Sequence, residues 1–318
     1  MALDEATAAF LTQMGEGGSK PLHEMSPEEA RGLGAELAAL YGEGPDMHRF
    51  AELSAPGIDG YLIPLRLLSP SESPRGVIVY FHGGGWTMGT VAEFDTLGRV
   101  LAERTGCAVA LVEYRLAPEN PYPTAVDDSW AALQWIDSNV ETLAGRRVPL
   151  IAAGDSAGAN LVAVLAIRAR DAGAPDLAMQ ILVCPVTDCD LDNETYRDPA
   201  NQLIVTREAM SWYWSNYAPD PSLREKPDLS PARASELSNV APAVMVIAEH
   251  DVLRQEGENY AKLLSDAGVP VESKVFAGQM HDFFCFVNVL PGSAEGISFV
   301  VDAIDHRLST LTERQLQR

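Results

Sequence analysis

The chain has 318 residues, 47% of them hydrophobic, and a net charge of −22 that arises from 45 acidic against 23 basic residues. An acidic surface repels phosphate backbones and anionic lipid headgroups, so this charge disfavours nucleic acid and membranes as partners. The four cysteines are too few and too scattered for a disulfide framework, and the N-terminal segment is acidic where a secretion signal needs a basic patch followed by an apolar run. We therefore expect a cytoplasmic globular protein.

The first part of the chain is predicted to form helices outside the main sheet. Residues 1–45 have a helical pattern, in which Ser26 is an N-cap and Pro27 stands at the first helical position. Residues 49–68 change to short extended runs separated by turn residues, which predicts an antiparallel hairpin.

A regular alternation of strands and helices follows. Six apolar runs have the character of buried strands, at residues 76–81, 107–112, 148–153, 179–184, 243–248 and 271–276. Helical patterns separate most of them, at residues 92–104, 125–139, 157–172 and 255–267. Strands without polar alternation are buried on both faces, and helices between them make right-handed parallel crossovers. The sequence predicts an α/β fold with a mostly parallel central sheet, flanked by helices and antiparallel at its start.

One interval, between Asp188 and Val240, contains no clear strand, and residues 207–217 within it have the pattern of an aromatic-rich helix. An insertion between two strands lies above their C-terminal ends, where a cap over a site is built. We therefore divide the chain into N-terminal cap helices (1–45), a first part of the α/β domain (46–187), a cap insertion (188–240) and a second part of the α/β domain (241–318).

The pattern Gly154-Asp155-Ser156-Ala157-Gly158 lies between a predicted strand and a predicted helix. A serine hydroxyl becomes a nucleophile when a sharp turn exposes it and a neighbouring base takes its proton, and glycines two positions either side prevent clashes in that turn. The pattern predicts that Ser156 is a catalytic nucleophile. The alternative is a glycine-rich turn that only caps a helix.

A second glycine-rich segment, His82-Gly83-Gly84-Gly85-Trp86, follows the predicted strand at residues 76–81. Attack on an ester places negative charge on the carbonyl oxygen, and backbone N–H groups free of side chains are suited to hold it. The alternatives are a phosphate-binding loop, whose glycine spacing does not fit, and a simple flexible loop. We expect His82 to brace the loop and not to act as a base.

A catalytic base is expected downstream of Ser156, because this fold places the acid and then the histidine after the nucleophile. Three histidines follow it. His306 falls in the helical pattern at residues 297–311 and is expected at the surface, and His250 immediately precedes the acidic candidate. His281 lies in a loop after the strand at residues 271–276, and it is the predicted base.

The acid that orients this histidine is predicted to be Asp251, which follows the apolar strand at residues 243–248. A carboxylate there holds the imidazole in one tautomer and stabilises its charged form. Glu249 and Asp282 are rival candidates, and Asp251 could instead cap the helix that follows it.

These motifs, in this order, resemble those of the hormone-sensitive-lipase-like branch of the α/β-hydrolases, the bacterial family IV esterases. The resemblance covers nearly the whole chain, from residues 82–85 through residues 113–119 and 154–158 to Asp251 and His281. It implies an α/β-hydrolase fold whose helical cap comes from the N-terminus and the insertion. It also implies that family members often dimerise through the last strand and helix, so a homodimer is expected by likeness.

The resemblance assigns roles around the nucleophile as well. The N–H groups of Gly83, Gly84 and Ala157 would form the oxyanion hole, and residues 114–119 would brace it. Two departures from the family pattern stand out. Gln255 replaces the usual aspartate four positions after Asp251, and Asp282 replaces the glycine that usually follows the histidine. A carboxylate at that position either raises the pKa of the base or faces solvent, and the sequence does not decide between the two.

Four residues are predicted to contact substrate: Trp86, Met210, Trp214 and Phe283. Met210 and Trp214 fall with Tyr217 on one face of the helix at residues 207–217, an arrangement that more often serves packing. The short cap and dispersed aromatics indicate a modest cleft that takes short acyl chains.

The features together predict a serine carboxylesterase that hydrolyses short- to medium-chain carboxylic esters through a covalent acyl-enzyme, with a small-molecule ester as its partner and with no cofactor or metal. Two alternatives stay open. One is an amidase or deacetylase that uses the same triad. The other is a non-catalytic small-ligand receptor of the same fold, which the loss of a triad member would mark.

Overall fold

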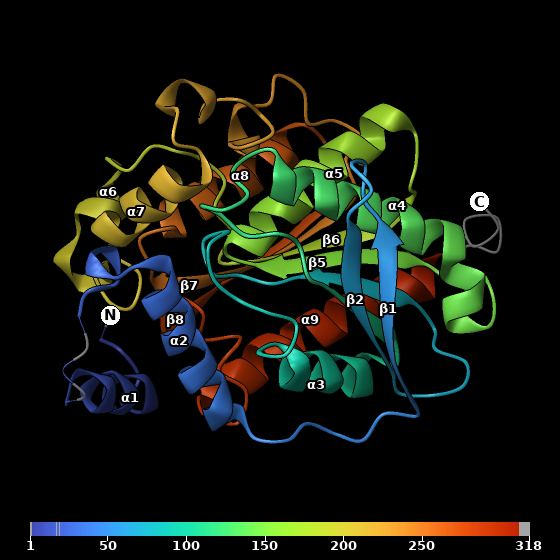
Figure 1. Cartoon of the computed structure of the whole chain (residues 1–318), viewed down its shortest axis with the longest axis horizontal. Coiled ribbons are helices and arrows are strands. Elements are labelled where there is room, and N and C mark those ends of the chain that lie inside the picture. Colours follow the sequence, from blue (N-terminus) through green and yellow to red (C-terminus); the bar gives the residue numbers. More distant parts are fainter. Residues whose placement is uncertain (1, 17, 19, 312–318) are drawn as a thin grey trace.

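The core of this protein is a twisted sheet of eight strands in the order β1-β2-β4-β3-β5-β6-β7-β8, among the residues that the computed structural model describes, which are 2–16, 18 and 20–311 (Figure 1). The pairs β1–β2 and β2–β4 are antiparallel, and all the later pairs are parallel. The strands are β1 (Arg49–Pro56), β2 (Leu62–Ser69), β3 (Val77–Phe81), β4 (Ala108–Val112), β5 (Leu150–Asp155), β6 (Leu177–Val183), β7 (Ala243–His250) and β8 (Val271–Met280). The predicted mostly parallel sheet with an antiparallel start is confirmed.

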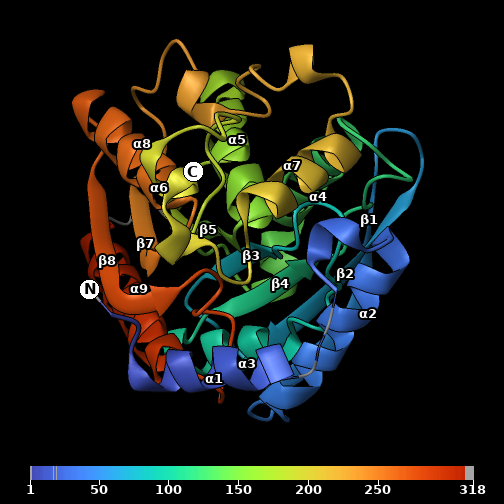
Figure 2. The ribbon, with the colours of Figure 1, turned by 90° about the vertical axis from the view of Figure 1, so that its left-hand side faces the viewer.

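Helices cover both faces of the sheet. On one face lie α3 (Asp95–Thr105) and α9 (Pro291–Thr310), and on the other lie α4 (Thr124–Ala144), α5 (Ala157–Ala172) and α8 (Arg254–Asp266), as Figures 1 and 2 show. Successive side chains of one strand enter different cores, since Val77 and Val79 pack on the α4–α5 side and Ile78 and Tyr80 pack on the α3–α9 side. Every residue of β3 to β6 is buried, which explains why these runs lack polar alternation.

The N-terminal segment contains α1 (Glu5–Glu16), η1 (Leu22–Glu24), α2 (Pro27–Ala38) and η2 (Ala39–Tyr41). At the start of α2, the side chain of Ser26 accepts a hydrogen bond from the N–H of Glu29, whose carboxylate accepts one from the N–H of Ser26. This capping box and the proline that follows confirm the predicted helix start.

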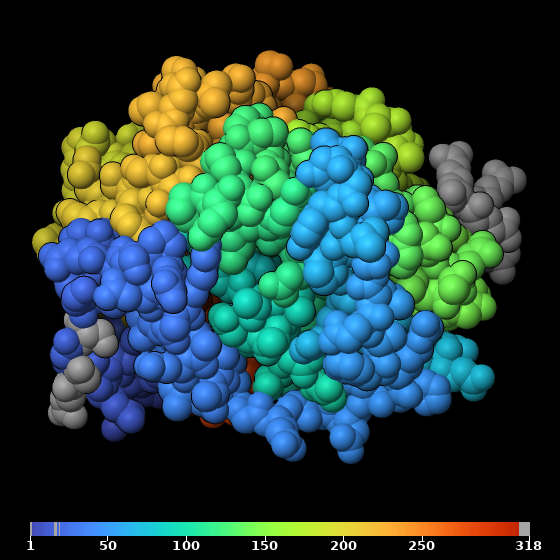
Figure 3. Space-filling model, viewed as in Figure 1, coloured from blue at the N-terminus to red at the C-terminus, as the bar shows by residue number. Residues whose placement is uncertain are grey.

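The insertion between β6 and β7 is helical, as predicted. It contains α6 (Glu194–Arg197), η3 (Pro199–Asn201), α7 (Arg207–Tyr217), η4 (Pro221–Leu223) and η5 (Pro231–Arg233). Figure 3 shows the N-terminal segment (blue) and the insertion (yellow) in contact at one end of the molecule. Both segments lie above the C-terminal ends of the parallel strands, which is where the predicted catalytic residues also lie.

Two predicted boundaries are wrong. The last strand was expected at residues 271–276, but β8 continues to Met280, with Gly278 at φ of +72° and an irregular register opposite Ala248 and His250. A glycine with positive φ occurs both in β-bulges and in turns that end a strand, so the sequence could not show which of the two forms at Gly278. The last helix begins at Pro291 and not near residue 297. Among the described residues, no helix has the length and apolar character needed to cross a membrane.

Candidate active site

The turn from β5 to α5 presents Ser156 in a strained conformation, with φ of 51° and ψ of −117°. Such a backbone is unfavourable for a residue with a side chain and persists only where its surroundings hold it. A Cβ at Gly158 would overlap the carbonyl oxygen of Phe81, and one at Gly154 would collide with the same oxygen. The N–H of Ser156 donates to the carbonyl of Val183 at 2.8 Å. The two glycines therefore permit the close backbone contacts that hold this turn.

Ser156, His281 and Asp251 form one line of hydrogen bonds. Nε2 of His281 lies 3.0 Å from Oγ of Ser156, and Nδ1 of His281 lies 2.7 Å from Oδ2 of Asp251. The second carboxylate oxygen of Asp251 accepts the N–H of Leu253 at 2.9 Å. All three side chains are buried, with exposed fractions of 6% or less. The structure thus brings together the three predicted catalytic residues from the ends of the parallel strands β5, β7 and β8.

The rival acids and histidines lie in other positions. The carboxylate of Glu249 accepts the N–H of Gly278 at 2.8 Å. His250 lies 3.9 Å from Glu249 and makes no contact with Ser156, and His306 is exposed on α9. Asp282 is different, because its Oδ1 lies 3.2 Å from Nε2 of His281, on the side of the ring that faces Ser156.

The pKa of His281 reflects these neighbours. Burial lowers the pKa of the imidazole, but the carboxylates of Asp251 and Asp282 raise it by more, to about 9. The sequence left open whether Asp282 faces the histidine or the solvent. In the structure its carboxylate faces His281, and 31% of its side chain is exposed where it lines a cavity.

The loop after β3 places glycines close to the nucleophile. A Cβ at Gly83 would overlap the carboxylate of Asp155, and one at Gly85 would overlap the ring of Tyr213. Gly84 has φ of +102°, which favours glycine. In the described part of the chain, the N–H groups of Gly83, Gly84 and Ala157 donate no hydrogen bond. These N–H groups are available to a substrate oxygen.

Side chains behind the loop brace it. The ring of His82 stacks on Tyr114 with centroids 4.4 Å apart, and its Nδ1 lies 2.8 Å from the carbonyl of Gly83. The hydroxyl of Tyr114 donates to the carbonyl of His82 at 2.7 Å, and the N–H of Ala117 donates to the carbonyl of Trp86 at 2.8 Å. Burial lowers the pKa of His82 to about 4, so this histidine is neutral and structural, in the position predicted for it.

Arg31 of α2 connects the N-terminal helices to the same loop. Its guanidinium donates to the carbonyls of Thr87 and Ala117 at 2.8 and 2.9 Å and pairs with Glu119 at 2.7 Å. The N-terminal helices are therefore hydrogen-bonded to the segment that follows the glycines predicted for the oxyanion hole.

A cavity of about 640 Å³ reaches Asp155, the residue before Ser156, and Asp282, the residue after His281. Its floor contains Gly83, Gly84, Asp155 and Asp282. The N-terminal segment contributes Leu11, Leu37 and Tyr41 to its walls, and the insertion contributes Leu203, Ala209 and Tyr213. A mostly apolar cavity of this size, next to a nucleophile, suits a small organic substrate.

None of the four residues predicted to contact substrate lines this cavity. Trp86 stacks on Tyr217 with centroids 4.3 Å apart and packs against Trp214, and all of these rings are buried. Met210 is 2% exposed in the same core, and Phe283 packs on Phe276 in the other core. All four side chains are packed in the core, which for Met210 and Trp214 agrees with the packing alternative. The helix α7 was predicted correctly, but the residues predicted on it, Met210 and Trp214, lie on the side that faces the core. Ala209 and Tyr213, on the adjacent side, line the cavity.

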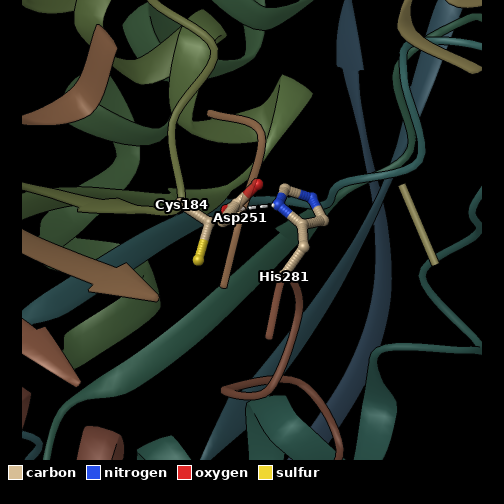
Figure 4. A group of neighbouring side chains, drawn as sticks. All are labelled: Cys184, Asp251 and His281. Carbon is tan, nitrogen blue, oxygen red and sulfur yellow. Dashed lines mark hydrogen bonds and ion pairs between the residues drawn. The ribbon is translucent and has the colours of Figure 1, made fainter. Parts of the chain in front are cut away.

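Among the residues that the structure describes, two groups of side chains have the composition of a metal site. Cys184, Asp251 and His281 form one (Figure 4), and Asp155, Asp282 and Cys285 form the other. In Figure 4 the imidazole points at the carboxylate and the sulfur of Cys184 points away from the ring. Burial and the charge of Asp251 raise the pKa of Cys184 well above its ordinary value, so the sulfur stays a thiol, which is a poor metal ligand. The first group therefore fits a hydrogen-bonded triad better than a metal centre.

Comparison with known proteins places this geometry in a family. The sequence pattern of the α/β-hydrolase fold family matches residues 78–285, and the chain belongs to that family, in the hormone-sensitive-lipase-like branch that its motifs resemble. The chain is 34% identical to the ethyl acetate hydrolase of Pseudomonas putida, with 97% of this chain and 100% of that protein covered. It is 39% identical to the carboxylesterase NlhH of Mycobacterium tuberculosis, over 75% of this chain and 77% of that protein.

Solved structures agree with this placement. A thermostable esterase from Pseudomonas putida superposes with a TM-score of 0.90 at 34% identity, over 98% of both chains. The hyperthermophilic esterase of the archaeon Pyrobaculum calidifontis superposes with a TM-score of 0.89 at 32% sequence identity, over 96% of this chain and 99% of that one. The relatives named here are all hydrolases of carboxylic esters or esterases.

Proposed function

We propose that this protein is a serine carboxylesterase that hydrolyses short- to medium-chain carboxylic esters through a covalent acyl-enzyme on Ser156. The observation that carries the proposal is the hydrogen-bonded line from Asp251 through His281 to Ser156, beside N–H groups that have no other partner. The curated relatives support the same reaction class.

In the first half of the reaction, Oγ of Ser156 attacks the ester carbonyl while Nε2 of His281 takes its proton. The carboxylate of Asp251 holds the imidazole in the tautomer with hydrogen on Nδ1 and stabilises the imidazolium that forms. The N–H groups of Gly83, Gly84 and Ala157 receive the negative charge that develops on the carbonyl oxygen. His281 then gives its proton to the departing alcohol, and the acyl group remains on Ser156.

In the second half, a water molecule attacks the acyl group and loses its proton to Nε2 of the same histidine. The tetrahedral intermediate again places its charge in the oxyanion hole, and its collapse returns the proton to Oγ of Ser156 as the acid leaves. In this scheme His281 accepts and returns the proton in both halves of the reaction.

The cavity supports a small substrate. Its volume of about 640 Å³ must hold both the acyl and the alcohol parts of the ester, and beyond a certain chain length added carbons meet the walls formed by the cap. The segments proposed as the cap, residues 1–45 and 188–240, both contribute to those walls. The retained triad argues against the receptor alternative, which would not need it.

A chain-length series of nitrophenyl esters tests this function. We expect activity to be highest on acyl chains of roughly two to six carbons and to be lost in Ser156→Ala, because a cavity of limited volume stops gaining buried area. A steady rise toward long-chain triglycerides, with activation at an oil interface, would contradict the substrate class.

The location and assembly of the protein are also proposals. Its four cysteines are free in the structure, which is in keeping with a reducing compartment such as the cytoplasm. Strand β8 forms one edge of the sheet, and its residues 272–275 are exposed. An exposed edge strand can pair with the same strand of a second copy, so we propose a homodimer that forms through β8 and α9.

A further inference from the structure

Asp282 lies at the ring nitrogen of His281 that serves the reaction, not at the nitrogen held by Asp251. Nε2 is 3.2 Å from Oδ1 of Asp282 and 3.0 Å from Oγ of Ser156. A neutral imidazole has one lone pair at this nitrogen, and that lone pair accepts one hydrogen bond. Oδ1 of Asp282 makes no hydrogen bond within the described residues, so it acts on the imidazole through its charge: an ionised carboxylate this close repels the lone pair and favours the protonated ring.

A second carboxyl group faces Asp282 from strand β5. Asp155 is buried, and its Oδ1 accepts the hydroxyl of Tyr80 at 2.7 Å. The polar atoms of Asp155, Asp282 and Cys285 all lie within 4.8 Å of one another. Two carboxyl groups this close do not both ionise readily, and burial together with the charge of Asp282 raises the pKa of Asp155 to about 7.

The other titratable groups near Asp282 carry no compensating charge. Burial raises the pKa of the surrounding hydroxyls and thiols, which are Tyr41, Tyr80, Tyr213, Cys184 and Cys285, so they stay neutral. The remaining ionisable residues that line the cavity are Lys20, His23, Glu93 and Glu208. Lys20 is exposed and pairs with Glu29 at 3.1 Å. The cation that contacts Asp282 is therefore the imidazolium of His281.

We propose that Asp282, paired with Asp155, holds the Nε2 proton of His281 in the free enzyme and thereby moves ester hydrolysis to higher pH than the three triad residues alone would set. As pH rises, this proton passes to water, and Nε2 becomes free to accept the proton of Ser156. The inference rests on the proposed esterase function. Asp282 acts through the histidine and is a positioning residue.

The pH profile of kcat/KM on para-nitrophenyl acetate tests the proposal in the wild type, Asp282→Asn and Asp282→Gly. Asn and Gly both tolerate the φ of +63° found at this position, so the fold is expected to persist. Removing a carboxylate this close to an imidazolium lowers the midpoint of the acid limb by about one pH unit or more in both variants. The exposed Asp302→Asn is the matched control and keeps the wild-type midpoint.

A midpoint that stays within about 0.3 pH units of the wild type in both variants would overturn the proposal, since an opposite charge in contact shifts a pKa by more than that. A uniform loss of kcat/KM at every pH, with no shift, would also overturn it, because that result assigns Asp282 a purely structural role.

A proton NMR titration separates this inference from the esterase proposal. The Nδ1 proton of His281 is expected at low field in the wild type and absent in His281→Ala, and its titration midpoint is expected to fall in Asp282→Asn. If the wild type cleaves no ester, the proposed function fails, and the NMR midpoint still decides whether Asp282 holds the proton. An unchanged midpoint rejects the inference even in an active enzyme.

Discussion

The proposed catalytic centre and the proposed cap differ in how tightly they are packed. In the centre, two backbone segments are in direct contact, as at Gly158, where any side chain would overlap the carbonyl oxygen of Phe81. The cap also makes backbone contacts with the domain, but α2 reaches the loop after β3 through the side chain of Arg31, and at Gly32 no atom lies within 4 Å of an added Cβ. Backbone contacts of this kind leave no room to move, whereas side chains can repack. We therefore expect changes in the centre to abolish turnover and changes in the cap to adjust substrate preference.

Removal of the nucleophile or the base should have the largest effect. Ser156→Ala and His281→Ala should each reduce kcat by about 10⁴-fold or more, because neither proton transfer nor acyl transfer remains. Steady-state kinetics on a short nitrophenyl ester measures this loss, and circular dichroism checks the fold. His306→Ala, on the exposed part of α9, is the control and should keep full activity. A folded and active Ser156→Ala protein would remove the basis of the triad.

The orientation of the base is the next test of the centre. Asp251→Asn keeps the shape of the side chain but favours the wrong imidazole tautomer, so kcat should fall by about 10³- to 10⁴-fold. Glu249→Gln is the comparison, since that carboxylate bonds the backbone of Gly278 and does not contact the imidazole. The acid would be misassigned if Glu249→Gln cost more activity than Asp251→Asn.

A single methyl group in the nucleophile turn should also be severe. Gly158→Ala forces the turn away from Phe81, and a displacement of about 1 Å at the nucleophile costs about 100-fold in kcat. Gly32→Ala adds the same methyl group to α2, where space is open, and should leave activity unchanged. Kinetics and thermal unfolding of the two variants compare the centre and the cap directly. Equal effects of the two substitutions would break the contrast between them.

Substitutions at two neighbouring residues of α7 should have different effects, because Ala209 lines the cavity and Met210 lies in the core. Ala209→Leu places three more carbons in the cavity and should reduce activity on hexanoyl esters about tenfold relative to acetyl esters. Met210→Leu changes the core-facing side by a substitution of similar volume and should keep the chain-length profile. A shift caused by Met210→Leu but not by Ala209→Leu would show that the cavity wall is placed wrongly.

Loosening the cap should have the smallest effect. Arg31→Ala removes the hydrogen bonds from α2 to the loop at Thr87 and Ala117, and we expect KM to rise about three- to tenfold while kcat changes little. Lys262→Ala breaks only an exposed ion pair with Asp266 on α8, away from the cavity, and should leave KM near that of the wild type. A large fall in kcat for Arg31→Ala would mean that this residue belongs to the centre.

The sequence alone was sufficient for the sheet, for helix α7 and for the three side chains that the structure joins by hydrogen bonds, Ser156, His281 and Asp251. Buried parallel strands require continuous apolar runs, and the nucleophile turn requires glycines on either side of Ser156 at a strand–helix junction. Asp251 and His281 could be found because the ends of parallel strands meet at one edge of the sheet. These requirements are local or follow from strand order, so they leave a pattern in the chain.

Only the tertiary structure decided which side of α7 meets the cavity and what Asp282 contacts. Met210 and Trp214 share a helical face that more often serves packing but can also line a pocket, and the choice depends on how α7 is rotated against Trp86 and Tyr217. Asp282 has its effect only because a turn with positive φ aims it at the imidazole, next to a carboxyl group from another strand. Such contacts depend on the relative placement of elements far apart in the chain, which no local pattern records.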